Sequence, residues 1–205
     1  MPSTMAVAGS YDDFFTAIRQ DDAPAIKALL LRGFDPNTLD PKARHGLTIA
    51  LSESSLKAAE ALLDARGVDV NWLNAQGESP LMYAALKGNL LLAQKLIDRD
   101  ADVNKTGWTP LHYAATKGDV PMIRLLLKNH AFVDSESPNG STPLMMAAQY
   151  GTLEAVKLLL EEGAEPAQKN EQQLTALDFA RRASRQDAVD LIAAAMRQRL
   201  PAASW

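Results

Sequence analysis

The stretch that decides the fold is Gly107–Ala115, which reads Gly-Trp-Thr-Pro-Leu-His-Tyr-Ala-Ala, because the chain repeats it. One copy lies upstream at Gly77–Ala85 and reads Gly-Glu-Ser-Pro-Leu-Met-Tyr-Ala-Ala. Another lies downstream at Gly140–Ala148 and reads Gly-Ser-Thr-Pro-Leu-Met-Met-Ala-Ala, and a degenerate copy follows at Gln173–Ala180. A motif that returns at a fixed interval indicates a fold built from stacked copies of one small unit.

The leucine of each copy gives the period, which is 30 residues from Leu81 to Leu111 and 33 residues for each of the next two intervals. Each clear copy continues with a glycine, a second apolar segment and a polar loop. The apolar segments have helical spacing. The hydroxyl residue before each proline is a candidate helix cap, since such a side chain accepts from exposed N–H groups while proline fits the first turn. These pairs are Ser79-Pro80, Thr109-Pro110 and Thr142-Pro143. The sequence therefore predicts two short helices per unit, which cross at the paired alanines.

These motifs resemble the ankyrin repeat, a helix–turn–helix followed by a β-hairpin-like loop. The resemblance covers nearly the whole chain and implies an all-α solenoid of about six units with short finger loops. The units are expected at residues 11–41, 42–75, 76–105, 106–138, 139–171 and 172–200. Residues 1–10 precede them as a disordered terminus or a signal-peptide remnant, and residues 201–205 form a tail.

The units at the two ends of the chain diverge from the motif. In the second repeat, at residues 42–75, Gly46 and Thr48 are expected to keep their signature places, with Ile49 where proline belongs. In the last unit Gln173 replaces glycine and Ala176 replaces proline. Terminal units of a repeat array are commonly atypical because one of their faces has no neighbour.

One finger loop is shorter than the others, because only Lys105 and Thr106 separate Asn104 from Gly107. The preceding loop has five residues at the same place, 72–76. The sequence predicts a stunted finger with a notch beside Trp108. A short finger next to this motif resembles a group of small bacterial ankyrin proteins that are exported to the periplasm.

Composition limits the function. The 205 residues carry a net charge of −4, which argues against a nucleic-acid or membrane-surface binder. The absence of cysteine excludes disulfides and thiolate chemistry. No apolar run is long enough to span a bilayer. Ala6-Val7-Ala8 has the small-x-small form of a signal-peptidase site but lacks the preceding basic and apolar regions. Periplasmic location is expected from this segment and the resemblance, with a cytoplasmic location as the alternative.

No catalytic or metal-binding motif stands out. The histidines, His45, His112 and His130, have no zinc-ligand spacing, and no nucleophile elbow or phosphate-binding glycine loop is present. The resemblance implies that His112 bridges loop backbones by hydrogen bonds. We therefore expect no enzyme, no cofactor and no metal.

The resemblance places partner contacts on the finger tips and the outward face of the first helices. Aromatic residues gather on this expected face, and Trp and Tyr are frequent interface hot spots. The face carried over from the family comprises Trp72, Asn74, Glu78, Tyr83, Lys87, Lys105, Trp108, Tyr113, Lys117, Ser141, Met146, Gln149 and Tyr150. The alternative for Tyr83 and Tyr113 is packing against a neighbouring unit.

The sequence thus predicts a non-catalytic, monomeric module that binds another protein through a concave groove and finger loops. The finer hypothesis is a regulator or inhibitor of a periplasmic enzyme. The first alternative is a stabilising scaffold with no discrete groove ligand. The second is an enzyme that uses scattered carboxylates and His112.

Overall fold

The structure is a computed structural model that describes residues 4–199, arranged as two compact units divided after Asp102. Twelve helices occupy the described residues and no named strand does, so the predicted all-α array of about six helix pairs is confirmed. Residues 1–3 and 200–205, which include the expected tail at 201–205, lie outside the described residues.

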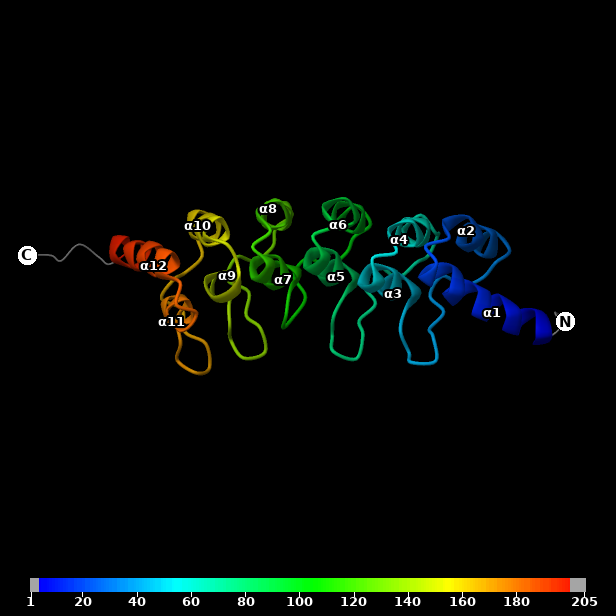
Figure 1. The fold of residues 1–205 in the computed structure, drawn as a ribbon, viewed down its shortest axis with the longest axis horizontal. Helices are drawn as coiled ribbons and strands as arrows, with labels where there is room; N and C mark the ends of the chain where they lie inside the picture. The colour runs from blue at the N-terminus through cyan, green and yellow to red at the C-terminus, as the bar shows by residue number, and fades with distance from the viewer. Residues whose placement is uncertain (1–3, 200–205) are drawn as a thin grey trace, which may run out of the picture. The chain divides into compact units, whose positions relative to one another are not determined.

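The first unit contains three helix pairs, α1–α6, which are labelled in Figure 1. Within it α3 packs on both α1 and α5, and α4 packs on both α2 and α6. The helices are α1 (Thr4–Arg19), α2 (Ala23–Leu31), α3 (Gly46–Glu53), α4 (Leu56–Leu63), α5 (Pro80–Lys87) and α6 (Leu90–Ile97).

The second unit also contains three pairs, and α9 packs on both α7 and α11. The helices are α7 (Pro110–Lys117), α8 (Val120–Lys128), α9 (Pro143–Tyr150), α10 (Leu153–Glu161), α11 (Ala176–Arg182) and α12 (Gln186–Gln198). In this unit the first helices of the pairs form one layer and the second helices another, and the finger loops project from the first layer (Figure 1).

Small and apolar side chains at the repeated positions form the core. Leu81, Leu111 and Leu144 are completely buried. The alanine pairs of α5, α7 and α9 are buried as well, and their place at the crossing of the two helices stays a prediction. Each buried leucine contributes roughly 1.5–3 kcal/mol to stability. Leu177, in the last pair, is only half-buried, as expected for a terminal repeat.

Two asparagine side chains, Asn71 and Asn104, lie at the base of finger loops and form hydrogen bonds to the loop after the next helix pair. Asn71 donates from Nδ2 to Asp100 O (3.0 Å) and accepts from Asp102 N (2.7 Å). In the second unit Asn104 does the same with His130 O (2.7 Å) and Phe132 N (2.8 Å). Both groups of each amide are therefore satisfied, which fixes the base of one finger against the following helix pair.

The finger loops are closed by turns rather than by long strands. In the second finger Asn74 N donates to Glu78 O and Gly77 N donates to Asn74 O (2.9 Å). The finger before α9 has the same pattern, and the first finger adds an isolated antiparallel bridge between Leu39 and His45. The loop before α7 is visibly shorter than the loop before α9 (Figure 1), as the spacing predicted; a notch beside Trp108 stays a prediction.

The structure corrects the alignment of the second repeat. Ala43, with a φ of 54°, donates to Asp40 O (2.8 Å) as Gly77 donates to Asn74 O, so Ala43 holds the signature glycine position. Gly46 is instead the first residue of α3, and Thr48 is the third. A Cβ at Gly46 would lie 3.0 Å from Ile18 Cδ1, so this glycine allows α1 to pack closely. The expected places of Gly46, Thr48 and Ile49 were therefore wrong.

The structure also corrects the expectation for the N-terminal residues. Helix α1 begins at Thr4, so the expectation of disorder is wrong for residues 4–10. Helix α1 therefore extends before residue 11, and the start of the first repeat at residue 11 stays a prediction. No helix among residues 4–199 combines the length and apolar character needed to cross a bilayer.

The helix caps follow the predicted chemistry with one variation. Met82 N donates to Ser79 Oγ (3.3 Å) and Met145 N donates to Thr142 Oγ1 (3.4 Å). At α7 the hydroxyl of Thr109 lies 2.9 Å from His112 Nδ1 instead. The ring also accepts from Thr109 N (3.2 Å) and donates from Nε2 to Ser141 O (2.9 Å), so the predicted bridging role of His112 is confirmed.

Stability should fall in acid through His112. Burial lowers the pKa of this imidazole to about 4, whereas an unfolded histidine has a pKa near 6.5. The neutral ring therefore stabilises the fold fully above pH 6.5, and about 3 kcal/mol is lost as the pH falls to 4. In His112→Met, which copies Met82 and Met145, we expect about 1 kcal/mol less stability at pH 7 but a smaller loss on acidification. Urea unfolding at pH 7 and pH 4 measures both, and equal acid losses in the two proteins would contradict the assignment.

Candidate functional site

A cleft of about 590 Å³ opens in the first unit, between its first two finger loops. One wall is the first finger, from Leu39 to Arg44, and the other is the second finger, from Trp72 to Gln76. Helix α3 contributes Thr48, Ile49 and Ser52 to the lining between the two fingers, which we call the floor, and α5 contributes Tyr83. Clefts of this volume are typical of binding sites.

Trp72 is half-buried and stacks on His45, with ring centroids 5.6 Å apart and planes inclined by 20°. His45 is completely buried, and burial lowers the pKa of its imidazole, so the stack is between two neutral rings. His45 donates from Nε2 to Asn37 Oδ1 (3.1 Å), which holds the histidine and hence the indole in place. Trp72 therefore presents a fixed aromatic surface to the cleft.

Tyr83 belongs to a hydrogen-bonded triad with the second finger. Its hydroxyl donates to Glu78 Oε2 (2.7 Å) and accepts from Asn74 Nδ2 (3.2 Å), while Asn74 Nδ2 also donates to Glu78 Oε2 (2.8 Å). Burial and the hydrogen bond to Glu78 raise the pKa of Tyr83 to about 12. The phenol is thus neutral, and it joins α5 to the finger that carries Trp72.

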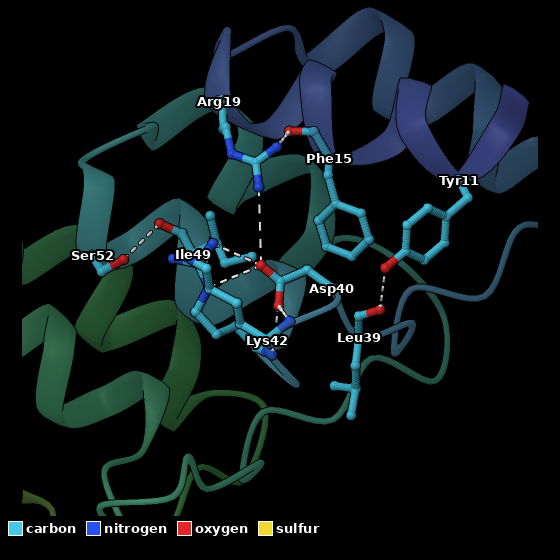
Figure 2. Close-up of polar contacts among 9 residues, drawn as sticks. Tyr11, Phe15, Arg19, Leu39, Asp40, Lys42, Ile49 and Ser52 are labelled. Carbon is cyan, nitrogen blue, oxygen red and sulfur yellow. Dashed lines mark hydrogen bonds and ion pairs between the residues drawn. The ribbon is translucent and has the colours of Figure 1, made fainter. Parts of the chain in front are cut away.

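The first finger is built around the carboxylate of Asp40 (Figure 2), whose side chain is only 1% exposed. Asp40 accepts from the backbone N–H groups of Lys42 and Arg44 (2.9 Å each) and from Arg44 Nε (2.9 Å) and Nη2 (2.7 Å). Arg19 of α1 adds an ion pair at 3.9 Å. Burial opposes ionisation of Asp40, but the hydrogen bonds from Arg44 outweigh it, so the pKa of this carboxyl is lowered.

Two buried polar atoms at the start of α3 have no hydrogen-bond partner among the described residues, His45 Nδ1 and Thr48 Oγ1. These residues occupy the N-cap and the third helical position, where Thr109 and His112 bond to each other at α7. The second repeat therefore carries the same two residue types in reverse order, and the bond is not made.

In the second unit the structure places two candidate residues beside the short finger. Lys105 folds back on its own loop, donating from Nζ to Thr106 O (2.8 Å) and Trp108 O (3.3 Å). Trp108 is half-buried and meets the edge of His112, with ring centroids 5.2 Å apart. Lys105 therefore contacts its own loop and Trp108 contacts α7, and both side chains remain partly exposed.

The remaining candidates differ in exposure. Lys87 in the first unit and Lys117 in the second are exposed, Tyr113 is half-buried, and Tyr150 is 61% exposed. The structure contradicts the outward placement of Met146, which is only 7% exposed because α9 is packed between α7 and α11. Ser141 is buried too, and its polar groups are satisfied there: its carbonyl accepts from His112 and its hydroxyl accepts from Asn170 Nδ2 (3.2 Å).

Each unit thus holds its own part of the predicted face. The cleft of the first unit brings Trp72, Tyr83 and Asn74 together and adds Lys42, Arg44 and Thr48, which sequence reasoning missed. The missed residues lie in the second repeat, where the signature alignment was wrong. Within the described part of the chain, no group of three His, Asp or Glu side chains could hold a metal ion.

Comparison with known proteins agrees with this architecture. The family model described as "Ankyrin repeats (3 copies)" matches residues 14–106, 66–137, 92–170 and 111–199. The chain is 28% identical over 100 residues to the putative ankyrin repeat protein YahD of Escherichia coli (49% of this chain and 49% of YahD). It is 36% identical over 70 residues to rat ankyrin repeat and SAM domain-containing protein 6 (34% of this chain and 8% of that protein). The matched segments therefore span half or less of these relatives.

Solved structures match over more of the chain. An ankyrin repeat domain from Acinetobacter baumannii has a TM-score of 0.79 at 28% identity, covering 89% of this chain and 97% of that chain. A structure of the Bdellovibrio bacteriovorus predatory endopeptidase Bd0816 in complex with the immunity protein Bd3460 matches with a TM-score of 0.78 at 26% identity. The coverage is again 89% and 97%.

The hydroxyl of Thr48, which lies in the cleft floor without a hydrogen-bond partner, leads to a prediction about stability. Thr48→Val removes a buried polar atom without a partner and keeps the side-chain shape, so we expect the free energy of unfolding to stay the same or rise by about 1 kcal/mol. Thr109→Val, which removes a hydroxyl bonded to His112, should lower it by about 1–2 kcal/mol. Urea unfolding of both variants measures the difference. Equal destabilisation would show that Thr48 is hydrogen-bonded in solution.

Proposed function

The chain belongs to the ankyrin repeat family, and from this premise we propose that it binds an enzyme in the periplasm and regulates or inhibits that enzyme. Ankyrin repeat domains are generally non-catalytic binding modules. Stacked repeats give a stiff surface, so little conformational entropy is lost when a partner binds. We further propose that the protein is a monomer and that it contacts its partner through the finger loops and the first helix of each pair.

The observation that carries the proposal is the similarity to the chain in the complex of an endopeptidase with its immunity protein. That likeness extends over 89% of this chain, with 26% identity. In that structure a protein partner is an enzyme, which is the type of partner that we propose here. A periplasmic setting is supported by the resemblance of the short finger beside Trp108 to exported bacterial ankyrin proteins.

The surface chemistry supports protein binding in each unit. In the first unit the cleft offers Trp72 as a fixed aromatic surface among polar groups. In the second unit Tyr150 is 61% exposed at the end of α9, and Trp108 and Tyr113 are partly exposed. Partly exposed Trp and Tyr are the residues that most often dominate binding energy at interfaces.

Tyr150 provides the test, because its exposure suggests little role in folding. We expect Tyr150→Ala to weaken partner binding by about 2 kcal/mol, or roughly thirtyfold, as an interface hot spot would. Phe132→Ala is the matched control, since Phe132 is 66% exposed in the same unit but lies in the loop after α8. Affinity capture from a periplasmic extract identifies the partner, and titration of the purified partner gives both affinities.

The readout for regulation is the activity of the captured enzyme with and without the wild-type chain. We expect its activity to change on binding. Equal affinities of Tyr150→Ala and Phe132→Ala would remove this part of the surface from the proposal. If aromatic substitutions lowered only the stability and no partner was captured, the scaffold alternative would stand instead.

A further inference from the structure

We propose that the cleft of the first unit binds an extended, acidic segment of the partner protein. This inference rests on the proposed function and specifies the chemistry of one part of the contact. It is carried by the charge of the cleft, by the residues that surround Asp40, and by the groups that are already hydrogen-bonded.

The charged side chains that line the cleft are both cationic, Lys42 and Arg44, although the whole chain has a net charge of −4. Positive charge is thus concentrated here against the overall balance. Complementary charge steers association and selects partners. An acidic segment meets the condition, whereas a basic one would be repelled.

The cluster around Asp40 strengthens this argument (Figure 2). Arg19 and Arg44 both form ion pairs with the Asp40 carboxylate of the first finger, and Lys42 lies two residues after Asp40 and donates its backbone N–H to it. Both oxygens of Asp40 are occupied, Oδ1 by two backbone N–H groups and Oδ2 by the Arg44 guanidinium. One carboxylate is therefore paired with two guanidinium groups, while Lys42 contacts it only through its backbone N–H. Among the side chains that the structure describes, no ion pair includes Lys42.

Exposure leaves this surplus charge within reach of a partner. The side chains of Arg19 and Arg44 are 44% and 40% exposed, and Lys42 is exposed at the finger tip. On the opposite wall the polar groups are already used, because Tyr83 and Asn74 bond to Glu78. Among the charged side chains that line the cleft, the cations of the first finger are therefore the groups within reach of a ligand.

The shape and the apolar surface define the rest of the ligand. A volume of about 590 Å³ suits a short extended segment. Trp72 lies opposite the cations, and Leu39 and Leu73 at the walls are 37% and 46% exposed. An aspartate or glutamate next to an apolar residue would place its carboxylate on the first finger and its neighbour on the indole.

The probe is a hexapeptide with blocked ends, Glu-Leu-Glu-Glu-Leu-Glu, with its glutamine counterpart, Gln-Leu-Gln-Gln-Leu-Gln, and inorganic phosphate as comparisons. Titration of the full chain followed by amide chemical shifts gives the dissociation constant and the residues affected. We expect the acidic peptide to shift the amides of residues 39–48 and 72–76, to bind at least about tenfold more tightly than the glutamine peptide, and to weaken with added salt.

Lys42→Glu is the variant that tests the charge, because no side-chain ion pair of Lys42 is lost. Lys57→Glu is the matched control, since Lys57 is exposed on α4 in the same unit and does not line the cleft. We expect about a tenfold weaker affinity in the first and less than a twofold change in the second. Urea unfolding of both variants verifies that each is folded.

Several results would overturn the inference. These are equal affinities for the two peptides, equal losses in the two variants, or no shift of the cleft amides at millimolar acidic peptide. Displacement of the acidic peptide by phosphate at the same concentration would assign the cations to a phosphate ligand instead. None of these peptide results changes the expected capture of a partner by the wild-type chain or the effect of Tyr150→Ala on it. Failure of this inference and failure of the proposed function are therefore distinguishable.

Discussion

Within each of the two units, burial of the apolar side of one helix pair against the next pair is the constraint on which the structure depends. No single pair is large enough to enclose a core of its own, so stability comes from the intrinsic terms of each repeat and from the interfaces between neighbours. Completely buried leucines and alanines, such as Leu144 with Ala147 and Ala148 in α9, supply these interfaces. Substitution at one interface is therefore felt by the pairs on both sides of it.

Once the interfaces are filled, the finger loops are free to carry function. Their bases are tied to the following pair by Asn71 and Asn104, and their tips are closed by local turns. A tip can then exchange its side chains at little cost to the core. The first finger uses an aspartate with an arginine, and the second uses an asparagine with a glutamate, on nearly the same backbone hydrogen bonds. Arg44 is one of the two cations that line the cleft between them.

The sequence predicted the regular repeats well because their signals are local. A hydroxyl residue before proline marks a helix start, and the paired alanines mark buried positions. The second repeat was misaligned because Ala43 adopts a positive φ that the sequence gives no reason to expect, while Gly46 serves close packing with α1. Because of that misalignment, Lys42, Arg44 and Thr48 were not recognised as candidate site residues. Met146 was misplaced because its exposure is decided by α7 and α11, which pack on α9, and not by its repeat position.

Native-state hydrogen exchange on the wild-type chain and Leu144→Ala tests the central constraint most directly. Removing this completely buried side chain should cost about 2–5 kcal/mol. Because α9 packs on both α7 and α11, we expect the slowest amides of all three helices to lose protection together. Faster exchange in α9 alone, with α7 and α11 unchanged, would contradict a fold held together by shared interfaces.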